Sequence, residues 1–175
     1  MKQFSISLLI IAILCGGGSV FAEDKTPNLI ITGTVTSASC TVDTSSQTLT
    51  VPLPDILTGA FAQVGDTGEK KEFLIKLKDC DDGVSGATIT FSGTRDSDNP
   101  GLLQITRGTG SATGVGVEII DETTDSAISP GQSVATKALT TGDNTLAYQL
   151  RYKSTLATVT AGSANAVMYF DLVYQ

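Results

Sequence analysis

Several residue types are missing from this chain of 175 residues, and each absence narrows what the protein can do. Histidine and tryptophan are both absent. Without histidine, the Ser-His-Asp and Cys-His catalytic arrangements and most catalytic zinc sites are excluded. Without tryptophan, a core built like that of an antibody domain is excluded as well. We therefore predict no catalytic residues, no metal site and no cofactor.

Positive charge is also scarce, with 11 Lys and Arg against 18 Asp and Glu and a formal net charge of −7. An acidic chain repels phosphate backbones, so nucleic acid is not an expected partner. The same excess of negative charge argues against a purely electrostatic attachment to anionic membranes.

The sequence has no apolar run long enough to span a bilayer, which needs roughly 20 residues. Its main apolar run covers residues 4–14, follows Lys2 and precedes Val20, Phe21 and Ala22. This three-part pattern predicts a signal peptide over residues 1–22. Cys15 raises the alternative of a lipid anchor, but Leu14 stands where lipoprotein signals need a small residue.

Two cysteines, Cys40 and Cys80, remain after residue 22. An even number of cysteines in an exported protein indicates a disulfide, and two buried free thiols are the alternative. A bridge across about 40 residues would stabilise the fold by roughly 4 kcal/mol in the chain-entropy model.

The chain after residue 22 is long enough for one domain with a core. It is rich in Thr and Val, and turns containing Gly, Asp, Ser and Pro separate short alternating segments. This pattern predicts an all-β sandwich of immunoglobulin type, with one helical turn near residues 55–61. The expected strands are residues 29–42, 47–53, 72–78, 87–93, 102–106, 114–121, 144–153 and 166–174.

Residues 96–101 resemble the beginning of a calcium loop. However, Pro100 stands at a ligand position, and Arg107 stands where the closing glutamate belongs. We predict a turn there. Asp79, Asp81 and Asp82 are similarly interpreted as a charged turn and not as the carboxylate pair of a glycoside hydrolase.

The first expected strand has a feature of its own. Side chains alternate along a strand, so four residues share one face: Leu29, Ile31, Gly33 and Val35. Such a strand can pair within its own domain or be lent to another chain. The pattern by itself leaves both possibilities open.

The end of the chain carries the most specific motif. Gly162 is fourteenth from the C-terminus, Tyr174 is penultimate, and apolar residues alternate before it at Met168, Phe170 and Leu172. The chain resembles the structural subunits of chaperone–usher pili, the type 1-like fimbrial proteins. The resemblance also rests on the alternating tail, Cys40, the Asp79-Cys80 pair, residues 114–121 and Leu150-Arg151-Tyr152.

The resemblance implies an immunoglobulin-like sandwich that lacks its last strand and is completed by a donor strand from another subunit. It divides the chain into a signal peptide (residues 1–22), a donor-strand extension (residues 23–35) and a pilin domain (residues 36–175). Leu29, Ile31, Gly33 and Val35 would be the donor strand. The acceptor groove and chaperone-recognition residues would be Gly162, Met168, Phe170, Leu172 and Tyr174.

The implied function is that of a shaft or adaptor pilin, which is not an enzyme and supports adhesion. Its expected partners are neighbouring pilus subunits, a periplasmic chaperone and an outer-membrane usher. Its expected location is the fimbrium at the cell surface, reached through the periplasm. The main alternative is a monomeric secreted β-sandwich that binds a ligand, and a secreted hydrolase is the third reading.

Overall fold

A computed structural model describes residues 38–175, which belong to the compact unit Thr36–Gln175. The predicted signal peptide and donor strand, residues 1–22 and 23–35, lie outside the described residues. Within the described part, no helix has the length and apolar character needed to cross a bilayer.

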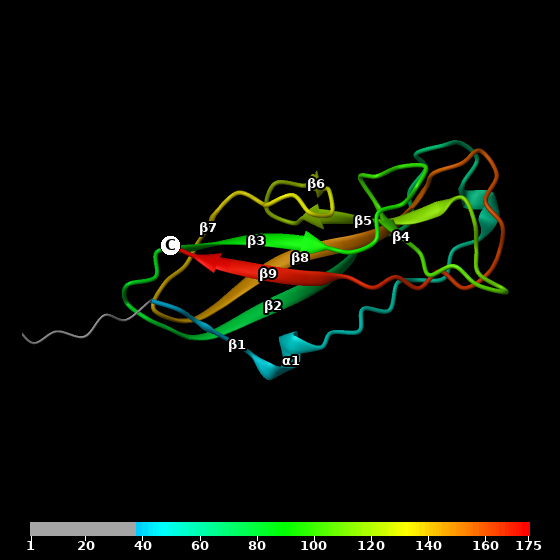
Figure 1. Cartoon of the computed structure of the whole chain (residues 1–175). Coiled ribbons are helices and arrows are strands. Elements are labelled where there is room, and N and C mark those ends of the chain that lie inside the picture. Colours follow the sequence, from blue (N-terminus) through cyan, green and yellow to red (C-terminus); the bar gives the residue numbers. More distant parts are fainter. Residues whose placement is uncertain (1–37) are drawn as a thin grey trace, which may run out of the picture. The chain divides into compact units, whose positions relative to one another are not determined.

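The structure is almost entirely β, as predicted (Figure 1). Its two helical elements are α1 (Thr44–Gln47) and a 3-10 helix (Thr58–Ala60). The strands are β1 (Thr41–Val42), β2 (Lys71–Cys80), β3 (Gly86–Ser92), β4 (Leu103–Gln104), β5 (Val115–Asp121), β6 (Ser126–Ile128), β7 (Lys137–Ala138), β8 (Gly142–Ser154) and β9 (Tyr169–Tyr174).

Two antiparallel sheets form the sandwich. The larger has six strands in the order β1-β2-β8-β5-β4, with β6 also pairing with β5. The smaller has three strands in the order β7-β3-β9. In the larger sheet β2 and β8 pair over most of their length, from Lys71 opposite Leu150 to Leu77 opposite Asn144.

The core lies between the sheets and is built from alternating residues of each strand. Ile75 and Leu77 of β2 are fully buried, as is Ile89 of β3. Phe91 of β3 packs edge-on against Tyr148 of β8, with ring centroids 4.8 Å apart. The aromatic side chains thus join the two sheets at the centre of the molecule without a tryptophan.

The expected strands of the core are present with small shifts at their ends, but one expected strand is not. Residues 47–53 contain the end of α1 followed by a segment that pairs in no ladder. Asp43 caps α1 by accepting a hydrogen bond from the Ser45 amide (2.8 Å). Pro52 and Pro54 then lack the amide hydrogen that a ladder would need.

Other local predictions can also be checked. The helical turn expected near residues 55–61 is the 3-10 helix Thr58–Ala60. The turn at Asp96 is present, because the carboxylate of this buried residue accepts hydrogen bonds from the amides of Asp98 and Asn99 (3.0 and 3.1 Å). The short strands β6 and β7 were not expected.

Candidate functional site

The last strand, β9, is paired on one edge only. Its residues pair with β3, from Tyr169 opposite Ser92 to Tyr174 opposite Ala87. Among the described residues, no strand pairs with its other edge. A bare strand edge presents unpaired amide and carbonyl groups and is a template for another strand. The edge of β9 is therefore the first element of the candidate site.

The inward face of β9 is apolar yet incompletely covered. Met168, Phe170, Leu172 and Tyr174 pack against the core but are only half-buried. The corresponding positions of the neighbouring strand, Ile89 and Phe91 of β3, are fully buried. The structure therefore brings Phe170, Leu172 and Tyr174 of β9 together with Met168, which directly precedes the strand, on one face whose apolar side chains remain partly uncovered.

The segment that follows β1 carries a second apolar row beside the same core, and we call the space between this row and β9 the groove. Val42, Val51, Leu53 and Ile56 are also half-buried and pack against the same core. In Figure 1 this segment runs from α1 along the same side of the sandwich as the residues that lead into β9. The sequence pattern at Leu49, Val51 and Leu53 signalled this face, although we interpreted it as a strand of the domain's own sheet.

One end of the groove widens into a cavity of about 770 Å³. Two segments, residues 49–56 and 159–166, form its walls, and Val117, Leu150 and Tyr152 contribute to its lining. The hydroxyl of Tyr152 donates a hydrogen bond to the Ala164 carbonyl (2.9 Å), which ties one wall to β8. Burial of the phenol raises the pKa of Tyr152, and the negative charge of Asp55 adds to the effect.

Gly162 also lines this cavity, and the structure shows why a glycine is needed there. A Cβ atom at this position would lie 2.4 Å from the Ala112 nitrogen and 2.6 Å from the Gly110 carbonyl oxygen. The backbone of residues 159–166 can approach residues 110–112 so closely because Gly162 has no side chain. Gly162 is thus part of the cavity wall, apart from the row of side chains on β9.

The other end of the groove lies beside the disulfide. Cys40 and Cys80 are bonded, as predicted. The hydroxyl of Tyr174 donates to the Cys40 carbonyl (3.3 Å) and joins the end of β9 to the start of β1. Burial raises the pKa of Tyr174 further above its ordinary value, which favours the protonated phenol that donates this hydrogen bond.

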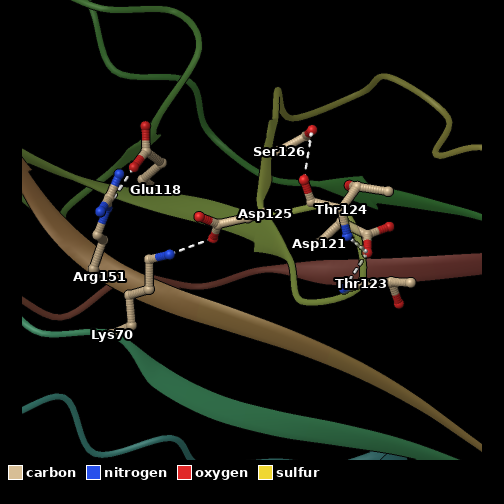
Figure 2. Close-up of polar contacts among 8 residues, drawn as sticks. All are labelled: Lys70, Glu118, Asp121, Thr123, Thr124, Asp125, Ser126 and Arg151. Carbon is tan, nitrogen blue, oxygen red and sulfur yellow. Dashed lines mark hydrogen bonds and ion pairs between the residues drawn. The ribbon is translucent and has the colours of Figure 1, made fainter.

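The far edge of the sandwich, between β5 and β7, is closed. Asp121 of β5 and Lys137 of β7 form an ion pair between the two sheets (2.6 Å), and the Asp121 side chain is 5% exposed. Asp121 also accepts hydrogen bonds from the amides of Thr123 and Thr124 (Figure 2). Burial raises the pKa of Asp121, but the hydrogen bonds and the charge of Lys137 outweigh it, so the pKa is lowered overall.

A second buried carboxylate, Glu118, lies on the outer face of β5. Arg151 and Lys153 of β8 contact its two oxygens at 2.6 and 2.7 Å, and Figure 2 shows Arg151 facing it across the sheet. Burial raises the pKa of Glu118, while the hydrogen bonds from Lys153 and Arg151 lower it below its ordinary value. This paired arrangement stabilises the sheet and offers no free acid or base.

Neither carboxylate site is arranged to hold a metal. In residues 38–175, no cluster of three His, Cys, Asp or Glu side chains could hold a metal ion. The arrangement that stands out is instead an apolar groove beside an unpaired strand edge, which can accept a β-strand.

Comparison with known proteins agrees with this geometry. A family model described as Fimbrial protein matches residues 29–175. The chain belongs to the fimbrial protein family. It is 35% identical to the fimbrial subunit type 1 of Salmonella typhimurium, with 100% of both chains covered. It is 40% identical to the fimbrial-like protein YcbU of Escherichia coli (strain K12), with 83% of this chain and 82% of that protein covered.

Solved structures show the same fold. A type I fimbria protein of Burkholderia pseudomallei superposes with a TM-score of 0.62 at 40% identity, covering 79% of this chain and 91% of that one. The P pilus rod subunit PapA superposes with a TM-score of 0.65 at 21% identity, covering 78% and 99%. The sandwich of this fimbrial protein is thus of the immunoglobulin-like pilin type.

Proposed function

We propose that this fimbrial protein is a shaft or adaptor subunit that polymerises by donor-strand exchange. The observation that carries the proposal is the unpaired edge of β9, which borders a groove lined by half-buried apolar side chains. Relatives named as fimbrial subunits match over their full length, which supports a structural role in a fimbria. Such a fimbria is exported to the cell surface.

The donor strand in this proposal is the N-terminal extension of a neighbouring copy or a related subunit. Leu29, Ile31 and Val35 lie outside the described residues, but their alternation in the sequence matches a strand with one apolar face. Burying each of these side chains would contribute roughly 1.5–3 kcal/mol. A ladder of backbone hydrogen bonds along β9 would add to that.

The direction of the donor follows from where each domain begins. Cys40 lies at the Tyr174 end of the groove, so an extension preceding it leaves the domain at that end. In an open head-to-tail fibre, this end of the donating subunit meets the opposite end of the accepting subunit, where the cavity lies. Val35 therefore reaches the cavity, Leu29 reaches toward Tyr174, and the donor runs antiparallel to β9.

Before assembly, the same edge needs protection, because a bare apolar strand edge promotes aggregation. Strand addition by a periplasmic chaperone is a known solution for pilins. In this proposal a chaperone covers β9 in the periplasm, and an outer-membrane usher passes the subunit to its neighbour. The residues that pair first with the chaperone and then with the donor strand of the neighbour are Phe170, Leu172 and Tyr174.

The proposal can be tested with the mature chain, residues 23–175, by placing one charge on either face of the extension. Ile31→Asp puts a carboxylate on the face that enters the groove, whereas Thr34→Asp puts the same group on the other face. We expect Ile31→Asp to prevent polymerisation and to lower the melting temperature by 10 °C or more (roughly 2.5–5 kcal/mol for a domain of this size). Thr34→Asp should still polymerise, because its carboxylate stays on the solvent side of the strand.

Sedimentation and thermal unfolding followed by circular dichroism measure both effects. If Ile31→Asp and Thr34→Asp behave alike, Ile31 does not enter an apolar groove and donor-strand exchange is contradicted. A stable monomer that is indifferent to both changes is the result expected of the alternative, a monomeric ligand-binding sandwich.

A further inference from the structure

The outward face of β9 carries apolar side chains that nothing in its own sheet covers. Tyr169 is 66% exposed and Val173 is 62% exposed, and Asp171 lies between them. On β3 their direct neighbours are Ser92 and Thr88. The Thr88 hydroxyl is already hydrogen-bonded to Thr136 (3.0 Å). The remaining side of this row is the unpaired edge of β9, where the proposed donor strand would lie.

The aliphatic residues on the inward face of the donor do not fix its register by themselves. A strand shifted by two residues keeps the same side chains on the same face. Because Leu29, Ile31 and Val35 are all aliphatic, a shifted donor would still bury apolar side chains. A device that rejects the shifted registers is therefore needed to give one defined junction.

Gly33 indicates which register is used. Phe170 and Tyr174 are the two aromatic residues among the half-buried inward side chains of this row. Gly33 opposite Tyr174 would carry Ile31 and Leu29 beyond the end of β9, so Phe170 is the aromatic partner that keeps the donor on the strand. A glycine opposite an aromatic residue leaves room for the ring and is a recognised cross-strand combination. In an antiparallel donor, Gly33 opposite Phe170 places Ile31 opposite Leu172 and Leu29 opposite Tyr174.

The same register makes the outward pairs complementary. Ile30 falls opposite Val173, Thr32 opposite Asp171, and Thr34 opposite Tyr169. A shift of two residues one way places Ile30 opposite Asp171, and a shift the other way places it opposite Gln175. Of these three registers, only the unshifted one pairs two apolar side chains, and directly opposed pairs of this kind stabilise a sheet.

We propose that the outward face of β9 is a register-selecting contact for residues 28–35 of a second copy, with Ile30 on Val173 as the deciding pair. This inference rests on the proposed function, because it needs a donor strand at the edge of β9. It adds a specificity determinant on the solvent side of the strand, separate from the groove.

Disulfide formation between cysteines placed on two copies measures the register directly. Mature chains carrying Ile30→Cys are polymerised with chains carrying Val173→Cys, Asp171→Cys or Gln175→Cys, leaving the Cys40–Cys80 bridge intact. Opposed residues have Cβ atoms roughly 4.5–5.5 Å apart and diagonal neighbours roughly 7–8 Å apart. A disulfide needs roughly 3.5–4.5 Å, so only the opposed pair should be trapped efficiently.

On non-reducing gels, we expect the mixture containing Val173→Cys to give at least five times as much covalent dimer as either of the other two mixtures. Preferential trapping by Asp171→Cys or Gln175→Cys would overturn the register. Equal trapping at all three positions would show that the outward face selects nothing.

A second measurement tests whether the pair matters energetically. Ile30→Thr and Val173→Thr should each accelerate dissociation of the polymer about two- to fivefold, and the double variant should show no further change of that size. Val64→Thr is the matched control, because Val64 is 62% exposed like Val173, lies in a loop and does not line the cavity. Additive effects of the two changes would contradict a direct contact.

Failure of this inference can be told apart from failure of donor-strand exchange. Suppose that the original chain polymerises, that Ile31→Asp abolishes polymerisation, and that the disulfide forms preferentially with Asp171→Cys or Gln175→Cys. This result would refute the register but not donor-strand exchange. If Ile31→Asp is harmless and no mixture gives trapped dimers, the donor strand itself is refuted, and the register contact with it.

Discussion

Gly162 shows how one residue without a side chain shapes the acceptor site. Its Cα lies so close to the backbone of residues 110–112 that even a methyl group would overlap with it. The wall that it belongs to is held from the other side by the hydrogen bond between Tyr152 and Ala164. The sequence marks Gly162 by its distance from the C-terminus, whereas the reason for the glycine is visible only in the packing of two backbones.

Replacing Gly162 by alanine should destabilise the protein. The added methyl group meets backbone atoms that cannot rotate away, so we expect a loss of roughly 1–3 kcal/mol in the free energy of unfolding. Urea denaturation measures it. Gly108→Ala is the matched control, because a Cβ there has no neighbour within 4 Å. An equal effect of both changes would mean that residues 110–112 readily move apart from the wall.

At the scale of the elements, adjacent strands hold each other through their outer as well as their inner faces. Glu118 of β5 joins Arg151 and Lys153 of β8 on the outer face, while Ile119 and Leu150 are paired in register within the core. By contrast, the segment after α1 has a groove-facing row of apolar side chains but no strand partner. Its alternation is that of a strand because Val51 and Leu53 pack against the core, whereas Pro52 and Pro54 lack the amide hydrogens that a ladder would need.

The Glu118 contacts predict a pH dependence of stability. The pKa of Glu118 is lowered in the folded state below its ordinary value of 4.5. Its contribution is therefore complete above pH 4.5 and is lost as the pH falls through the folded-state pKa. We expect Glu118→Gln to cost roughly 1.5–3 kcal/mol at pH 7, with the difference from the original chain shrinking below pH 4.5.

Urea unfolding curves at pH 7, 5, 4 and 3 measure this difference. Glu122→Gln serves as the control, since Glu122 is exposed on the same hairpin and should change stability by less than about 0.5 kcal/mol. A difference for Glu118→Gln that stays constant down to pH 3 would contradict the role of its ionised carboxylate.

At the scale of the whole molecule, the two edges of the sandwich differ. One is closed by the ion pair between Asp121 and Lys137, together with the short strand β6 on β5. At the second edge, beside β9, the hydrogen bond from Tyr174 to the Cys40 carbonyl joins the two sheets at one end, and the cavity lies at the opposite end. Of the edge strands in the described domain, β9 is the one flanked by a row of half-buried apolar side chains, so it is where an added strand would bury most apolar surface.

This asymmetry predicts where hydrogen exchange changes on assembly. Amides of β9 that point to the open edge should be protected in the polymer, whereas those of β5 and β8 should be protected to the same extent in both states. In the Ile31→Asp variant the β9 amides at the open edge should exchange at least tenfold faster than in the polymer. Uniform exchange changes across all strands would argue against a contact at one edge.

The sequence by itself determined the all-β class, the disulfide and the face shared by Phe170, Leu172 and Tyr174. These features depend on local alternation, turn residues and cysteine count, all of which are readable along the chain. It did not place β6 and β7, because strands of three and two residues are too short to show a period. It also could not tell that residues 47–53 lack a strand partner.

Only the tertiary structure decided which edge is open. Alternation shows which side chains face inward, but it does not show whether another strand covers them. That depends on the pairing of β9 with β3 alone, and on the half-burial of side chains that a complete sandwich would cover fully. The cavity beside Gly162 likewise arises where segments more than a hundred residues apart in the chain meet, and no local pattern records such a meeting.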